Sequence, residues 1–281
     1  MTGILFTGFA GAAFLVTRLI LPPILEMLRE AGFVRPNYRR EQIPLGAGLV
    51  FFLAALVILA LGRFTGLADR SANIFLFSMG AMGLFGLIDD VFGTRGASGL
   101  TGHFKKLFLE KEITTGSLKA LAGLLIALLV SLEFGEGAGI HKWVFLLVNS
   151  LIISLSTNAV NLLDLRPGRA GKGFLIMSLF MVATSTGKTE LLYLAVILGS
   201  LIAFLPHDLG ASAMMGDTGS NMLGITLGFT AVYVLGAPVK LAFLLFLVVF
   251  HVLTEKYSLT RIIERNRVLN YLDMMGRDGD S

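Results

Sequence analysis

Apolar runs longer than about 18 residues recur along this chain of 281 residues, and such runs are too long for ordinary buried helices. Lipid offers no hydrogen-bond partners to a bare backbone, so segments that span it must be helices or a closed barrel. The runs are continuous rather than alternating, which favours helices. With 55% hydrophobic and only 15% charged residues, the sequence predicts an all-α, polytopic integral membrane protein.

The hydropathy pattern predicts about nine transmembrane helices. We place them at roughly 2–21, 45–62, 73–91, 117–134, 143–160, 173–186, 190–206, 218–236 and 239–256. The first run has neither a basic leader nor a convincing cleavage site, so we expect it to remain as an anchor. We divide the chain into a polytopic transferase-like membrane domain at 1–257 and a cytoplasmic, basic, amphipathic tail at 258–281.

The distribution of lysine and arginine predicts the orientation. With the N-terminus outside, seventeen of the 23 basic residues fall on inside segments and five on outside segments, while Arg18 lies within the first span. Cytoplasmic loops carry an excess of these residues, which supports N-terminus out and C-terminus in. The net charge of +4 is too small to suggest nucleic acid, and the absence of cysteine excludes disulfides, thiolate metal sites and cysteine nucleophiles.

Several acids mark the ends of predicted spans. Asp89 and Asp90 end the third span, Asp164 follows the fifth and Asp217 opens the eighth, and the parity of the crossings places all four on the cytoplasmic side. Acids at the hydrocarbon margin are costly unless they are paired or bound to a cation, so the cluster predicts a site for Mg²⁺ and a phosphorylated substrate. For any single acid, a solvated helix end is an equally good interpretation. The adjacent pair argues against it, because neighbouring carboxylates repel.

Two further segments suit phosphate binding. Residues 91–119 form a glycine-containing inside loop. Its side chains that can donate hydrogen bonds to phosphate oxygens are Arg95, His103, Lys105, Lys106 and Lys119. A basic inside loop is also expected from topology alone. The stretch "MMGDTGSNMLG" at 214–224 places a carboxylate beside free backbone N–H groups at the positive end of a helix.

The motifs "GLIDD", "GLTGHFK", "NAVNLLD" and "MGDTGSNMLG", with "EQIPLGAG" before them, occur in a recognisable order and spacing. In these motifs the chain resembles the polyprenyl-phosphate N-acetylhexosamine-1-phosphate transferases, a glycosyltransferase 4 type superfamily, as a divergent member. The resemblance implies Mg²⁺-dependent transfer of a sugar-1-phosphate from a UDP-sugar to undecaprenyl or another polyprenyl phosphate, with release of UMP. It also implies a role in cell-wall or surface glycan synthesis, in the cytoplasmic membrane with the active site facing the cytoplasm.

The resemblance assigns roles to individual residues. Asp217 and Asp89 match the metal ligands, Asp89 and Asp90 match the acid pair at the acceptor phosphate, and Lys105 matches a family lysine. The stretch that helps to hold the nucleotide matches Asn158, Asn161 and Asp164. Pyrophosphate cleavage by a phosphate acceptor requires charge neutralisation and positioning more than covalent chemistry, although a covalent route through Asp90 stays open.

This chain also departs from the family pattern. Where the family usually continues Asn-Leu-x-Asp-Gly-Leu-Asp-Gly-Leu-Ala, this sequence has Asn-Leu-Leu-Asp-Leu-Arg-Pro-Gly-Arg-Ala. The second acid is therefore Pro167, and two arginines enter the loop. We interpret Arg166 and Arg169 as bidentate phosphate ligands, with topology alone as the other explanation.

The C-terminal segment lacks the family's histidine-rich loop. Glu264 and Arg265 stand where Asp-Arg stands in the family, and we count them with Lys106 as substrate contacts. Because the histidines are gone, a noncatalytic or respecialised member that binds lipid-linked intermediates, or uses a different nucleotide donor, stays an alternative. A homodimer is also left open.

Overall fold

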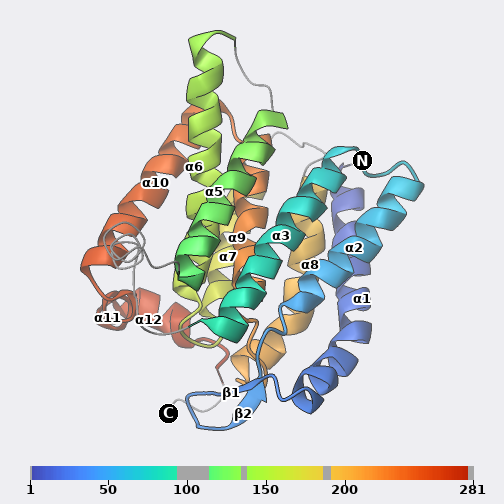
Figure 1. Ribbon diagram of the computed structural model, residues 1–281, viewed down its shortest axis with the longest axis vertical. Coiled ribbons are helices and arrows are strands. Elements are labelled where there is room, and N and C mark those ends of the chain that lie inside the picture. The colour runs from blue at the N-terminus through green and yellow to red at the C-terminus, as the bar shows by residue number, and fades with distance from the viewer. Residues whose placement is uncertain (1, 94–113, 134–137, 186–190, 278–281) are drawn as a thin grey trace.

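A computed structural model of the protein describes residues 2–93, 114–133, 138–185 and 191–277. All nine expected segments are helical in this part of the chain, which confirms the all-α prediction (Figure 1). The helices are α1 (Thr2–Glu30), α2 (Leu49–Phe64), α3 (Ser71–Phe92), α5 (Thr115–Glu133), α6 (Ile140–Leu163), α7 (Arg169–Thr184), α8 (Leu191–Leu209), α9 (Gly216–Val234), α10 (Ala237–Lys256), α11 (Leu259–Arg265) and α12 (Arg267–Met274).

Membrane crossing is supported for six of the described helices. The helices α1, α3, α5, α6, α8 and α10 are long and apolar enough to span a bilayer, so the protein is a multi-pass membrane protein. The helices α2 and α7 have only 16 residues each. Nine crossings and the outside N-terminus therefore stay predictions.

The first helix is longer than its sequence suggested. We expected it to end near residue 21, but α1 continues through Pro22 and Pro23 to Glu30. Proline inside a helix costs about 3 kcal/mol or more, because it removes a hydrogen bond and crowds the preceding turn. Leu25 and Leu28 are buried in the core, so their packing stabilises the turns beyond the prolines.

A short β-hairpin between α1 and α2 was not predicted. It pairs β1 (Val34–Pro36) with β2 (Gln42–Pro44) in antiparallel register. The chain beyond β2 bonds to the segment before α9, where the N–H groups of Ala47 and Gly48 donate to the carbonyls of Met214 and Met215 at 3.0 and 3.1 Å. The hairpin lies at the lower end of the bundle in Figure 1, beside the start of α9.

The central helix of the bundle is α9, which contacts α3, α6, α7 and α8. Seventeen of its 19 residues are buried, including several Gly, Ser, Thr and Asn side chains. Small residues permit close helix packing in a membrane. Gly224 and Gly228 lie one turn apart, directly against the α6 backbone at Thr157 and Ile153. This polar, glycine-rich composition explains why α9 is not among the six helices that are apolar enough to span a bilayer.

Gly224→Ala is expected to destabilise the bundle. An added Cβ would lie 2.5 Å from the Cα of Thr157, so α6 and α9 would have to separate. Overpacking of this kind costs about 1–3 kcal/mol, which thermal unfolding of the purified protein would report as a lower midpoint. Gly8→Ala is the matched control, because an added Cβ in α1 meets nothing within 4 Å. Equal midpoints for the two variants would refute the close α6–α9 contact.

Candidate active site

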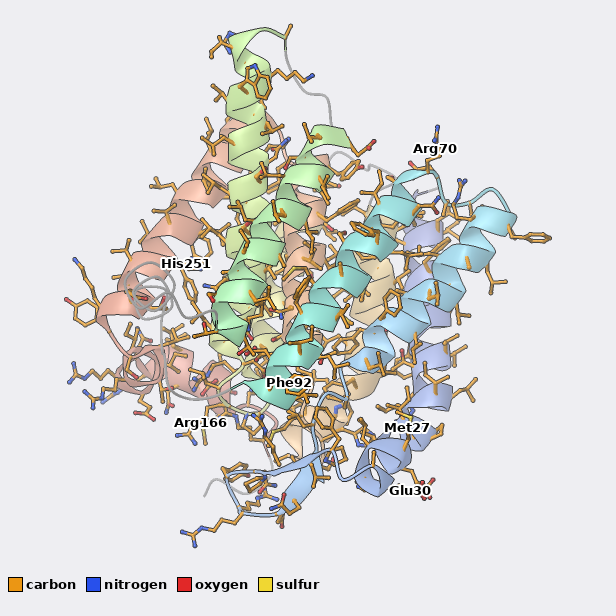
Figure 2. All side chains as sticks on the ribbon, in the orientation of Figure 1. Met27, Glu30, Arg70, Phe92, Arg166 and His251 are labelled. Carbon is orange, nitrogen blue, oxygen red and sulfur yellow. The ribbon has the colours of Figure 1, made fainter. Side chains whose placement is uncertain are left out.

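Four helix ends meet at one end of the bundle. They are the last turn of α3, the first turns of α5, the last turn of α6 and the start of α9. Figure 2 shows Phe92, at the end of α3, and Arg166, just after α6, at this lower end, and Arg70 at the opposite end. The predicted gathering of acids at a single end is therefore what the structure shows.

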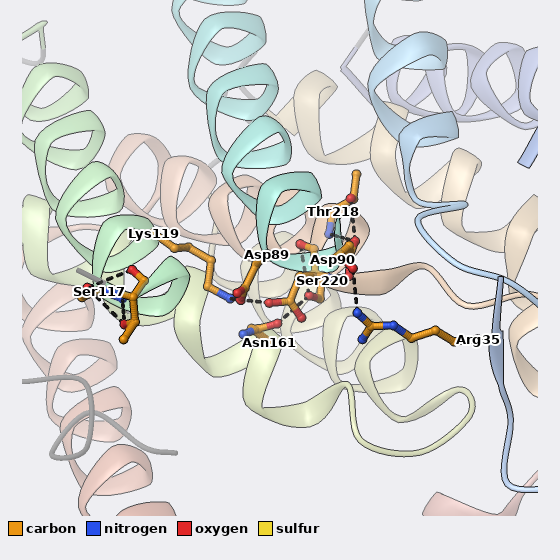
Figure 3. Close-up of polar contacts among 10 residues, drawn as sticks. Arg35, Asp89, Asp90, Ser117, Lys119, Asn161, Thr218 and Ser220 are labelled. Carbon is orange, nitrogen blue, oxygen red and sulfur yellow. Dashed lines mark hydrogen bonds and ion pairs between the residues drawn. The ribbon is translucent and has the colours of Figure 1, made fainter. Parts of the chain in front are cut away.

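Lys119 connects two of these acids. Its Nζ donates to Oδ2 of Asp89 at 2.7 Å and also pairs with Oδ2 of Asp217 (Figure 3). The Lys119 side chain is only 13% exposed. From the sequence this lysine is expected at the end of the basic loop 91–119, but in the structure it belongs to the first turns of α5. We call Asp89, Asp217 and Lys119, with Asn161 and Asp90, the acid cluster.

Asn161 completes the surroundings of Lys119. Both the oxygen and the nitrogen of its side-chain amide find hydrogen-bond partners when the oxygen faces the lysine. Oδ1 then accepts from Lys119 Nζ at 3.2 Å, while Nδ2 donates to Ser220 Oγ at 2.9 Å and to Asp217 Oδ1 at 3.0 Å. Three oxygen-bearing side chains from α3, α6 and α9 thus surround one positive charge.

Asp90 has a different place from its neighbour Asp89. Its side chain is 5% exposed, and Oδ1 accepts from the N–H of Asp217 at 2.9 Å. Oδ2 accepts from the N–H and hydroxyl of Thr218, at 3.0 and 2.7 Å. Consecutive helix residues point about 100° apart, so Asp89 faces Lys119 while Asp90 caps the start of α9. On the other side, Arg35 Nη2 donates to the Asp90 carbonyl at 2.7 Å.

Glycines make this approach of α3 to α9 possible. Gly216 has a φ of +70°, and an added Cβ would lie 2.5 Å from the Asp90 carboxylate. A Cβ on Gly86, in α3, would collide with the backbone carbonyl of Asp217. Side chains at either position would push Asp217 away from Asp89.

Asp164 is a further acid at this end of the bundle. It caps the C-terminus of α6, close to Asp208, whose Oδ2 accepts from the Gly168 N–H at 3.1 Å. Burial raises the pKa of Asp164 well above its usual value, and the charges of Asp208 and Asp217 raise it further. At the acid cluster itself, the three carboxyl groups of Asp89, Asp90 and Asp217 outnumber the single ammonium group of Lys119.

The structure corrects our interpretation of Arg169 as a phosphate ligand. Its guanidinium is 5% exposed, and Nε and Nη2 donate to the two carboxylate oxygens of Asp273 in α12, both at 2.8 Å. Arg277 Nη2 also pairs with Asp273 at 2.8 Å, and its Nε donates to the Pro167 carbonyl at 2.9 Å. We call Arg169, Asp273 and Arg277 the arginine latch, because it fastens the tail to the loop after α6.

The two arginines of the arginine latch lower the pKa of Asp273. Burial alone would raise the pKa of Asp273, but the hydrogen bonds and positive charges of Arg169 and Arg277 hold it below its usual value. The carboxylate is therefore ionised and neutralised by two arginines. The loop that the sequence suggested for nucleotide binding is thus held by the tail.

The remaining predicted site residues lie apart from these contacts. Arg166, Glu264 and Arg265 are exposed, and Asn158 is partly buried in α6. Within the described part of the chain, no hydrogen bond or ion pair joins these four residues to the acid cluster. Lys105 and Lys106 fall within 94–113, outside the described residues.

Three residues that contribute to this end of the bundle were not among the predicted site residues. Thr218 lies in the first turn of α9, and its N–H and hydroxyl donate to Asp90 Oδ2; its place in a first turn, where N–H groups need partners, is a signal that the sequence carries. Arg35 and Asp273 carry no such signal, because their partners lie 55 and 104 residues away in sequence. Only the folded chain brings them together.

Comparison with known proteins identifies the family of this chain. The model of glycosyl transferase family 4 matches residues 72–235, which run from α3 to the end of α9 and contain the whole acid cluster. The phospho-N-acetylmuramoyl-pentapeptide-transferase of Caldicellulosiruptor bescii is 26% identical, over 95% of this chain and 88% of the relative. Those of Bacillus mycoides and Bacillus thuringiensis are also 26% identical, over 82% of this chain and 75% of each relative. The chain therefore belongs to glycosyl transferase family 4, as a divergent phospho-sugar transferase of the polyprenyl-phosphate hexosamine-1-phosphate transferase superfamily.

Proposed function

We propose that the protein transfers a sugar-1-phosphate from a UDP-sugar to undecaprenyl or another polyprenyl phosphate, releasing UMP, in a Mg²⁺-dependent reaction at the cytoplasmic membrane face. The observation that carries this proposal is the meeting of the Asp89 and Asp217 carboxylates around one positive charge at the end of the bundle. The relatives named phospho-N-acetylmuramoyl-pentapeptide-transferase support a cell-wall sugar as the transferred group.

The residues of the acid cluster fit a magnesium ion. Asp89, Asp217 and Asn161 offer hard oxygen ligands around a position that already holds a cationic atom. Within the described residues no three acidic or histidine side chains converge on one point. Mg²⁺ does not require them, since it is commonly held by one or two carboxylates together with water and substrate phosphates. When bound there, the ion would neutralise charge on the pyrophosphate.

The acceptor phosphate is the nucleophile in this proposal. One of its oxygens attacks the phosphorus that carries the sugar, and the bond from that phosphorus to the UMP oxygen breaks. Asp89 faces the cluster and is 19% exposed, so it is placed to accept a proton from the acceptor phosphate. Asp90 holds α9 through both carboxylate oxygens, so we assign it to positioning Asp217 rather than to covalent chemistry.

The test is UMP release by the purified protein from a panel of UDP-sugars, with undecaprenyl phosphate and Mg²⁺. We expect release that requires both the lipid and the metal, and the active sugar identifies the donor. Lipid binding without UMP release, by a protein shown to be folded, would instead support the noncatalytic alternative. Release from another nucleotide donor only would overturn the assignment of UDP.

Arg166→Ala is expected to raise the donor KM about tenfold with little change in kcat. Arg166 is exposed and lies two residues after Asp164, at the end of the bundle that holds the acid cluster. A charge-assisted hydrogen bond from its guanidinium to a phosphate contributes about 1.5–3 kcal/mol. Steady-state kinetics with varied UDP-sugar measures the effect. Arg70→Ala, an exposed arginine at the opposite end, is the matched control (Figure 2). An unchanged donor KM would leave Arg166 with a topological role only.

A further inference from the structure

Lys119 occupies the position where a metal ion would have to bind. Its ammonium group contacts Asp89, Asp217 and Asn161, and these three residues are the ones that the proposed metal site would use. The Nζ–Oδ2 distance to Asp89 is 2.7 Å, so direct contact leaves no room for an ion between them. An ammonium group and a divalent ion cannot share this position, because both the space and the charge repulsion forbid it.

Lys119 is also the main neutralising charge for the two carboxylates. Arg35 approaches from the far side and donates to the Asp90 backbone carbonyl, not to a carboxylate. With the lysine removed, Asp89 and Asp217 would face each other as two like charges that are only 19% and 30% exposed. A second cation would then satisfy the pair in place of the lysine.

We propose that Lys119 is the resident counter-ion of the acid cluster and that a divalent cation displaces it, freeing its ammonium group at the site. The lysine has a flexible four-carbon stem and three donors, so it can move while its helix stays in place. Cation entry would therefore release a positively charged donor where the donor pyrophosphate must bind. This inference rests on the magnesium site of the proposed function.

Mn²⁺ binding to the metal-stripped, purified full chain tests the exchange, with free Mn²⁺ measured by electron paramagnetic resonance. Lys119→Met keeps an unbranched side chain of similar length and removes its charge, so the variant should bind Mn²⁺ at least about tenfold more tightly than the unaltered protein. Lys256→Met is the matched control, because it removes an exposed positive charge at the end of α10 without touching the carboxylates. Its affinity should equal that of the unaltered protein.

Two other results of the Mn²⁺ measurement overturn the inference. Equal or weaker binding by the Lys119→Met protein would show that the lysine does not compete with the metal ion for the carboxylates and has a structural role only. Absence of saturable binding by both proteins would reject the exchange together with the magnesium site. Because neither donor nor acceptor is present, a protein that shows the tighter binding but releases no UMP would keep this inference and lose only the transferase proposal.

A second measurement uses only the unaltered protein, so it does not depend on whether a variant folds. Amine acetylation of the unaltered protein, followed by mass spectrometry, reports the accessibility of individual lysines. Mg²⁺ should increase the acetylation rate of Lys119 severalfold, because the group leaves its two carboxylates, and should leave that of Lys256 unchanged. An unchanged rate at Lys119 would overturn the displacement.

Discussion

Asp217→Asn is expected to reduce Mg²⁺-dependent UMP release at least about a thousandfold while the protein stays folded. The substitution removes a negative charge from the pair that faces Lys119. The backbone N–H of Asp217 would still donate to Asp90, so the start of α9 should keep its cap. Turnover with undecaprenyl phosphate and a UDP-sugar, compared with thermal unfolding of the same preparation, separates the two effects.

Glu133→Gln is the control for this substitution. It also converts an acid to an amide, but at the exposed end of α5 that lies away from the acid cluster. It should leave turnover unchanged. Normal turnover by the Asp217→Asn protein would reject the assigned metal role of Asp217.

Asp273→Ala should produce the largest loss of stability among single substitutions in the tail. It leaves Arg169 and Arg277 buried side by side, at 5% and 4% side-chain exposure, without their shared carboxylate. Removing one partner of a buried ion pair costs about 3–5 kcal/mol, which corresponds to a fall of roughly 10 °C in the unfolding midpoint.

Thermal unfolding in detergent, followed by circular dichroism, measures this loss. Glu264→Ala is the matched control, because it removes an exposed acid from the adjacent helix α11 and should change the midpoint little. A midpoint for Asp273→Ala equal to that of the control would show that the arginine latch contributes nothing to stability.

The helices were predictable because hydropathy is a local property. Each of the nine apolar runs became a helix, whereas the full length of α1 and the β-hairpin were not predicted. The turns of α1 beyond Pro23 are stabilised by buried leucines, which no rule for proline reports. The hairpin consists of two strands of three residues each, too short for an alternating pattern to be visible.

The acid cluster was predictable in outline but not in its inner arrangement. The parity of the spans was sufficient to bring Asp89 and Asp217 to one end. It was not sufficient to separate the functions of Asp89 and Asp90, because that depends on how α3 is rotated against α9. Arg169 was misassigned for a related reason, since a basic residue beside a site suits phosphate and carboxylate equally well until its partner is known.

The arginine latch makes two departures from the family pattern interdependent. Arg169 is the first residue of α7, at the end of the altered segment that follows α6, and Asp273 belongs to the altered tail, so each segment supplies the charge that the other needs. A chimera that receives only one of them from this chain would bury an unmatched charge and should be unstable. The loop and the tail are therefore a single unit of exchange, and a functional hybrid with a relative would have to carry both.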